Sequence, residues 1–254
     1  MMGLIALARL TWRQILGRHR LGLWIFLCVL GALPVLAVAV ILASAQFDSS
    51  LQQRVLTEEF RTGLLRILFD YLQLPLLYPA IALLLAATSL REEIQNETII
   101  YLWIKPLSRA TLVISKYAVA LLATLVLSGL SALVTGALLV SDWASVGKFL
   151  FVIVMALPAY GALFFALSVI SDRALIWGFV YVLGWEELFS RISSAASQLS
   201  IRHYAENLER ALFGLPSEIS LETCLGVLLV LVALLLGLAI WRFSRMEFSG
   251  AEEG

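Results

Sequence analysis

Long apolar runs separated by short charged segments dominate the pattern of the chain. Six such runs lie at about 21–45, 71–90, 117–140, 149–170, 174–190 and 220–241. A helix of about 20 apolar residues is long enough to cross a hydrocarbon core of about 30 Å. The pattern therefore predicts an all-α integral membrane protein with six transmembrane helices.

Composition supports this prediction and excludes several classes of protein. Of the 254 residues, 61% are hydrophobic and 14% are charged, whereas soluble domains are about half apolar and a quarter charged. The mean hydropathy is +0.94. Little chain lies outside the apolar runs, so there is no room for a soluble catalytic domain. The net charge of zero argues against nucleic-acid binding.

Basic residues orient the predicted spans. If both termini are cytoplasmic, the inside segments hold 11 of the 18 basic residues, and the outside segments hold 11 of the 18 acidic ones. Basic residues favour the cytoplasmic side. We therefore expect a multi-pass protein of the inner (cytoplasmic) membrane of a prokaryote with both termini inside, which places the charged segment 91–116 in the cytoplasm.

The N-terminal segment 1–20 has two interpretations. Apolar residues recur at helical spacing around Trp12, while basic residues stay off that stripe, which predicts an amphipathic helix in the membrane interface. Alternatively, the segment is a positive flank that only fixes topology. The following run, 21–45, is too long for the core of a signal peptide, so we expect a retained span.

The fifth apolar run is short. Only twelve residues separate Arg173 from Glu186, about 18 Å of helix at 1.5 Å per residue. Either Glu186 and Glu187 lie at membrane depth, or neighbouring helices shield them. The next stretch, 191–219, is half polar and predicts outer re-entrant helices, allowed at membrane depth only where protein or a water-filled cavity covers them.

Glu186, Glu187 and Arg191 are candidates for an outer gate or a contact with a cationic substrate. Arg191 follows Glu187 by four residues and could pair with it on a helix. The alternative is a surface ion pair on the outer hairpin.

Several kinds of chemistry are missing from the sequence. It has no GxxxxGK[ST] phosphate loop, and His19 and His203 lie far apart. We therefore expect no catalytic, cofactor-binding or metal-binding residue. The middles of five predicted spans carry no ionisable residue, which ion-coupled transporters generally need. Energy for uphill transport would have to come from another subunit.

The charged segment 91–116 predicts a short helix between spans two and three. Asn96 can cap its N-terminus, Glu97 suits the positive end of its dipole, and Pro106 ends it. Tyr101 and Trp103 lie between an acidic and a basic flank. Aromatic anchors with a charged rim suit a protein contact. A loop that lies among lipid headgroups is the alternative.

The stretch REEIQNETIIYLWIKPLSRATLVISKY resembles the signature of the ABC-2 family of ABC-transporter permeases. Glu93, Glu97-Thr98, the apolar turn 99–104, the Pro-x-Ser-Arg step at 106–109 and Lys116 carry the resemblance. The family's usual Gly before the Thr is Glu97 here. The resemblance extends over the chain, which would then be a single ABC-2 transmembrane domain, 1–254.

The resemblance implies partners and residue roles. Segment 91–116 would be a cytoplasmic coupling helix that docks on an ABC-type ATP-binding subunit. The docking residues would be Glu93, Glu97, Thr98, Tyr101, Leu102, Trp103, Lys105, Pro106 and Arg109. Two permease chains, identical or different, and two ATPases would form the complex in lipid, with ATP and Mg in the ATPases. Alternatively, Arg109 and Lys116 only anchor at headgroups.

The leading functional prediction is the permease subunit of an ATP-driven exporter. One rival is a membrane scaffold that recruits an ATPase without transporting a small molecule. A lipid-modifying membrane enzyme is a second rival, but the sequence lacks the clustered His, Asp or Ser that it would need. Apolar walls are compatible with lipids, hydrophobic peptides or amphiphilic drugs. The outer loop 46–70 predicts an amphipathic helical cap.

Overall fold

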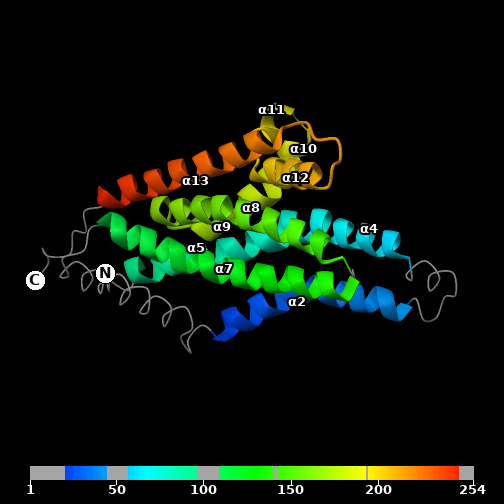
Figure 1. Cartoon of the computed structure of the whole chain (residues 1–254). Helices are drawn as coiled ribbons and strands as arrows, with labels where there is room; N and C mark the ends of the chain where they lie inside the picture. The colour runs from blue at the N-terminus through cyan, green and yellow to red at the C-terminus, as the bar shows by residue number, and fades with distance from the viewer. Residues whose placement is uncertain (1–20, 45–56, 96–108, 140–141, 193, 246–254) are drawn as a thin grey trace, which may run out of the picture.

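The computed structural model describes residues 21–44, 57–95, 109–139, 142–192 and 194–245, and these form helices without any strand. Figure 1 shows long helices lying side by side and running alternately in opposite directions. The expectations for the interfacial helix at 1–20 and for residues 97–106 concern parts of the chain outside the described residues.

The long helices follow the apolar runs. The first, α2, spans Leu21–Ser44. The second rod is continuous and combines α4 (Glu58–Leu68), the π-helical segment η2 (Phe69–Leu77) and α5 (Tyr78–Gln95). It is followed by α7 (Arg109–Leu139) and α8 (Trp143–Ile170). The last long helix, α13, spans Leu221–Ser244.

Shorter helices lie between α8 and α13. Helix α9 (Ala174–Phe179) continues into the π-helical segment η3 (Val180–Phe189) and α10 (Ser190–Ile192). Helices α11 (Ser194–Ser197) and α12 (Ile201–Leu212) complete the connection. Leu215 N–H donates to Arg210 C=O, and Gly214 takes a positive φ of 68° after the end of α12. Glycine tolerates this conformation, so the chain leaves α12 at Gly214.

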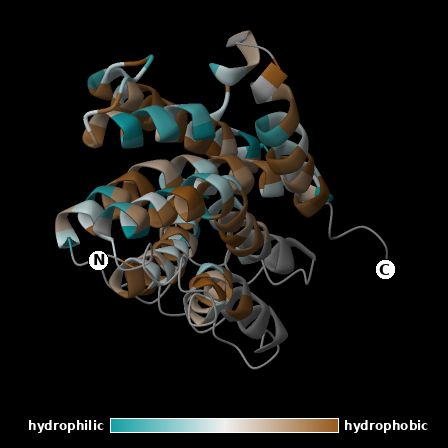
Figure 2. Cartoon of the chain, turned by 90° about the vertical axis from the view of Figure 1, so that its right-hand side faces the viewer, coloured by the Kyte–Doolittle hydropathy of each residue, from teal (hydrophilic) through white to brown (hydrophobic). Residues whose placement is uncertain are grey.

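Four helical stretches of the described residues are long and apolar enough to cross a membrane: Glu59–Ala87, Arg109–Leu139, Trp143–Ile170 and Leu221–Ser244. A shorter apolar stretch, Ala32–Ile41, lies within α2. The second predicted span, 71–90, corresponds to Glu59–Ala87 and so begins earlier than expected. The reason is that α4, which lies in the predicted outer loop 46–70, runs directly into η2. Figure 2 shows hydrophobic residues along much of the bundle, with hydrophilic residues on parts of several helices.

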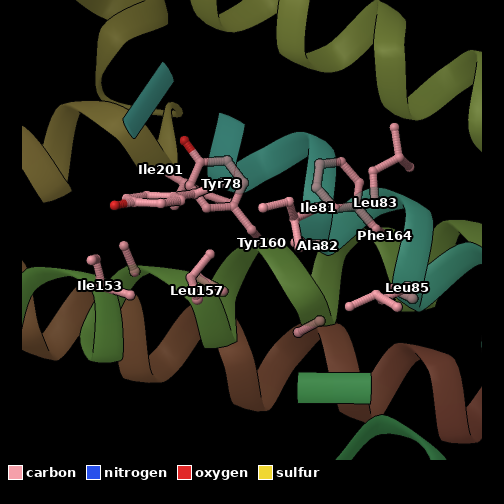
Figure 3. Close-up of a cluster of buried hydrophobic side chains, with 14 of the residues drawn as sticks. Tyr78, Ile81, Ala82, Leu83, Leu85, Ile153, Leu157, Tyr160, Phe164 and Ile201 are labelled. Atoms are coloured by element: carbon pink, nitrogen blue, oxygen red, sulfur yellow. The ribbon is translucent and has the colours of Figure 1, made fainter. Parts of the chain in front are cut away.

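Helix α8 forms the centre of the bundle, in contact with α5, α7, α12 and α13. Its side chains Ile153, Leu157 and Tyr160 lie against Tyr78 and Ile81 of the second rod, and all five are at most 1% exposed (Figure 3). Burial of such large apolar groups is the main stabilising term in packing. Helix α8 therefore holds the other helices in place.

Small residues set the closest helix approaches. Ser128, Ala132 and Gly136 are all buried on α7, and a Cβ on Gly136 would lie 2.7 Å from Cγ2 of Val146 on α8. Small residues four apart on one helix let a neighbouring helix approach closely. Gly178 plays the same role on α9, since a Cβ there would lie 2.2 Å from Cδ1 of Leu83.

Candidate functional site

Two ends of the bundle carry the residues of interest. At one end, α5 finishes at Gln95, α7 begins at Arg109 and α13 finishes at Ser244, so this end flanks residues 96–108. We call it the 96–108 end. At the opposite end lies α12, beside α4 and the start of α13 (Figure 1). We call it the α12 end.

Lys116 ties two helices together at the 96–108 end. Its side chain is only 1% exposed, and Nζ donates to the backbone carbonyl of Ser89, 3.3 Å away on α5. A lysine usually places its ammonium group in water or among headgroups. The headgroup interpretation of Lys116 is therefore wrong, because the protein itself encloses the side chain.

Arg109 makes a second link at the same end. Its Nη1 donates to the backbone carbonyl of Ser244, close to the C-terminus of α13. A cation there satisfies a free carbonyl and favours the negative end of the helix dipole. The exposed Arg109 thus joins the first turn of α7 to the last turn of α13, a contact that the sequence analysis did not predict.

The other predicted docking residues are not positioned by the structure. Glu97, Thr98, Tyr101, Leu102, Trp103, Lys105 and Pro106 lie outside the described residues. Glu93 belongs to the last turn of α5, but its side chain also lies outside what the structure describes. Their role stays a prediction.

Glu186 is the centre of a buried polar network at the α12 end. The residue is 0% exposed. Tyr160 donates to Oε2 at 2.6 Å, and Tyr181 donates to Oε1 at 3.0 Å. The backbone N–H of Arg202, in the first turn of α12, donates to Oε1 at 3.3 Å. A buried carboxylate needs such donors, and a helix N-terminus favours a negative charge.

This network joins three elements. Tyr160 comes from α8, Glu186 and Tyr181 from η3, and Arg202 from α12. Neighbouring helices therefore shield Glu186, which was one of the two expected solutions for the short fifth run. The helical stretch from α9 through α10 covers Ala174–Ile192.

The side chain of Arg202 forms ion pairs next to the Glu186 network. It is bonded to Glu187 and to Glu206, one turn further along α12. Its Nη2 also donates to the backbone carbonyl of Asp70 at 3.3 Å. The planar guanidinium group can serve several acceptors at once. Glu187 thus pairs with Arg202, and the predicted partner Arg191 has a side chain outside the described residues.

Arg66 and Glu209 form a third link between α4 and α12. Nε of Arg66 lies 2.9 Å from Oε1 of Glu209, and the Glu209 side chain is only 2% exposed. Burial raises the pKa of the Glu209 carboxyl above its ordinary value, against the opposing effect of Arg66. The charge of Arg66 also lies over the Phe213 ring, 4.5 Å from its centroid.

A polar cavity of about 290 Å³ opens beside these links. Asp70, Arg202, His203, Glu206, Glu209 and Arg210 supply its charged and titratable lining. A second, apolar cavity of about 320 Å³ lies between α8 and the α9–η3 stretch. Among the described residues no group of three or more His, Cys, Asp or Glu is arranged to hold a metal ion.

Sequence reasoning found Glu186 and Glu187 but missed their partners. Tyr160 and Tyr181 look like ordinary aromatic residues of apolar runs, and Arg202 looks like one charge of a polar helix. Asp70 offered a signal, since it directly precedes an apolar run, and the structure places it inside the Glu59–Ala87 stretch. Its position relative to α12 depends on the folding of distant segments.

Comparison with known proteins identifies the family. A family model described as ABC-2 family transporter protein matches residues 17–183, which include the stretch that carries the resemblance. No curated protein matches the chain. The family match covers well over half of the chain and agrees with its apolar helices. The chain therefore belongs to the ABC-2 family of transporter proteins, as a multi-pass membrane permease.

Proposed function

We propose that this chain is the membrane-spanning subunit of an ATP-driven exporter, in which a separate ATP-binding subunit hydrolyses ATP. The observation that carries the proposal is the family match over residues 17–183. The matched stretch contains segment 91–116, whose described ends are the last turn of α5 and the first turns of α7. In this proposal segment 91–116 is the ATPase-docking segment.

The contacts at the 96–108 end support a mechanical role. Lys116 bonds α7 to α5, and Arg109 bonds α7 to the end of α13. A push on the segment between α5 and α7 would therefore move three helices together rather than bend one of them. Closely packed helices transmit such displacements because the protein interior is dense.

The proposed complex has two copies of this permease, or this permease with a sister chain, and two ATPases that bind ATP and Mg. Both chain termini and the 96–108 end would face the cytoplasm of a prokaryote, and the α12 end would face outward. The basic residues of the inside segments support that orientation.

The outer-gate role proposed for Glu186, Glu187 and Arg191 takes a more specific form. Glu186 is too deeply buried to meet substrate directly, and it instead holds α12 against α8 and η3. We propose that it controls whether α12 can move away from the bundle. Glu187 and Arg202 would form the more exposed side of the same gate.

Affinity purification of the tagged full chain from its native membrane in mild detergent, followed by an ATPase assay, tests the proposal. The test variant carries Glu97→Ala, Tyr101→Ala and Leu102→Ala. A matched control carries Leu122→Ala, Val126→Ala and Leu130→Ala, three exposed positions on α7. We expect a phosphate-loop ATPase to copurify with wild type and control and to be lost from the test variant.

Two results would contradict the proposal. If a well-folded wild-type chain brings down no ATPase, segment 91–116 is a membrane-surface feature. If an ATPase copurifies and hydrolyses ATP, but reconstituted vesicles move no lipid, peptide or amphiphile, the chain is a scaffold. ATP-dependent accumulation inside inverted vesicles would support export.

A further inference from the structure

The polar cavity at the α12 end is lined by charged side chains that the protein interior encloses. Glu209 is 2% exposed and Arg202 is 8% exposed, and both line the cavity of about 290 Å³. Burying a charge is costly unless it is paired or bound. Each of these two therefore has a protein partner: Glu209 is bonded to Arg66, and Arg202 is bonded to Glu187 and Glu206.

Two other charged groups of the lining have no such partner. Oδ1 of Asp70 is enclosed and accepts no hydrogen bond from any described residue. The exposed side chain of Arg210 makes no hydrogen bond or ion pair within the described part of the chain. Both residues line the same cavity. Their charges attract each other, but neither side chain forms a hydrogen bond or ion pair with a described residue, so the lining holds one acidic and one basic group without a direct partner.

Arg66, four residues before Asp70 and outside the cavity lining, also has an enclosed polar atom without a hydrogen bond to a described residue. This atom is Nη2. Arg66 and Asp70 are four residues apart on the continuous rod formed by α4 and η2, so their side chains share one face. Native structures leave few enclosed polar atoms unsatisfied, and a bound molecule is one reason for an exception.

We propose that this cavity binds a zwitterionic group that carries a primary ammonium together with a phosphate or carboxylate. The ammonium would donate to Asp70, and the acid group would accept from Arg210. A purely cationic ligand would face Arg202 and Arg210, and a purely anionic one would face Asp70, Glu206 and Glu209. A ligand with both charges meets each unpaired group with the opposite sign.

Two sources supply this chemistry: a phosphatidylethanolamine headgroup from the surrounding membrane, or a free amino compound. The inference rests on the cavity alone and not on ATPase binding or transport. Ligand binding to the purified chain can therefore succeed or fail independently of the proposed exporter function.

The experiment uses the full chain in nanodiscs made of phosphatidylcholine. Isothermal titration with O-phosphoethanolamine, phosphocholine and inorganic phosphate tests the free source. Native mass spectrometry after mixing with phosphatidylethanolamine, phosphatidylcholine or phosphatidylglycerol tests the lipid source. The binding variants are Asp70→Asn and Arg210→Gln, and the matched controls are Glu222→Gln and Arg173→Gln, which change exposed charges outside the cavity.

We expect saturable binding of O-phosphoethanolamine or of phosphatidylethanolamine to the wild type. Each binding variant should weaken it about tenfold or more, since each loses one charged hydrogen bond. The controls should stay within about twofold. Binding of only the lipid would identify a headgroup site, and binding of the free compound a solute site.

Four results would overturn the proposal. They are the absence of saturable binding, equal affinity for phosphocholine, equal affinity for inorganic phosphate, and unchanged affinity in both binding variants. Phosphocholine has the same charges as O-phosphoethanolamine but no ammonium N–H. Comparing the two ligands therefore tests whether a hydrogen bond from the ammonium to Asp70 is needed for binding. Arg210 is exposed, so the Arg210→Gln variant should fold. It keeps the test decisive even if the Asp70→Asn variant fails to fold.

Discussion

Tyr160 donates a 2.6 Å hydrogen bond to the carboxylate of Glu186, which joins the central helix α8 to the π-helical segment η3. Both residues are 0% exposed. The bond lies next to the N-terminus of α12, whose Arg202 N–H reaches the same carboxylate. Removing either partner should therefore loosen α12 as well as the contact between α8 and η3.

Tyr160→Phe should lower the thermal stability of the purified chain. The change keeps the ring and removes one donor to an enclosed carboxylate, which typically costs about 1–3 kcal/mol. Thermal unfolding in detergent, followed by circular dichroism, measures the shift. Tyr71→Phe is the matched control, because Tyr71 is 69% exposed. Equal melting temperatures for the two variants would contradict the role of the Tyr160 bond.

Replacing both Glu186 and Glu187 by Gln should impair transport and leave ATPase assembly intact. The substitutions remove two negative charges: Glu186 accepts from the N-terminus of α12, and Glu187 pairs with Arg202. Both residues lie at the α12 end, opposite the 96–108 end where the ATPase would dock. ATP-dependent movement of fluorescent lipids or amphiphiles in inverted vesicles measures transport, and copurification measures assembly. A control with Glu218→Gln and Glu222→Gln changes two exposed charges. Unchanged transport in the test variant would remove the gate hypothesis.

Gly178→Ala should destabilise the contact between α9 and α5. The added Cβ would lie 2.2 Å from Cδ1 of Leu83, and overpacking of this kind costs about 1–3 kcal/mol. Gly226→Ala on α13 is the control, because no atom lies within 4 Å of a Cβ there. Adding Leu83→Val to the Gly178 variant should recover part of the lost melting temperature. No difference between Gly178→Ala and Gly226→Ala would show that the helices have room to move apart.

Arg66→Gln should make stability fall more steeply as pH rises from the acidic range. Burial raises the pKa of Glu209 above 4.5, and the nearby Arg66 opposes that shift. An acid whose folded pKa is raised favours the folded state below its ordinary value and loses that contribution as pH rises through the folded pKa. Without Arg66 the folded pKa of Glu209 rises further, so the stability lost as pH rises above 4.5 becomes larger.

Melting temperatures at pH 5 and pH 8 measure this effect. The difference between wild type and Arg66→Gln should be larger at pH 8. Arg61→Gln, five residues earlier on α4, is the control for loss of a positive charge. A difference that is equal at both pH values would mean that the Arg66–Glu209 pair does not control the protonation of Glu209.

The candidate site was only partly predictable from the sequence. The charges of Glu186 and Glu187 stood out because they end a short apolar run. Tyr160 and Arg202, which bind them, lie 26 and 16 residues from Glu186 and on other helices. The hydrophobic pattern predicts which residues are buried, but it does not predict which buried polar groups bond to one another.

Local patterns alone therefore determined a helical membrane protein, the course of most long helices and the resemblance confirmed by the family match. These depend on the length and periodicity of apolar runs, which are properties of contiguous residues. Tertiary structure decided that Lys116 is enclosed, that Arg109 reaches α13, and that α12 covers Glu186. Each of these depends on which helix faces are close-packed against one another, because enclosed charges are tolerated only where distant segments bring them a partner.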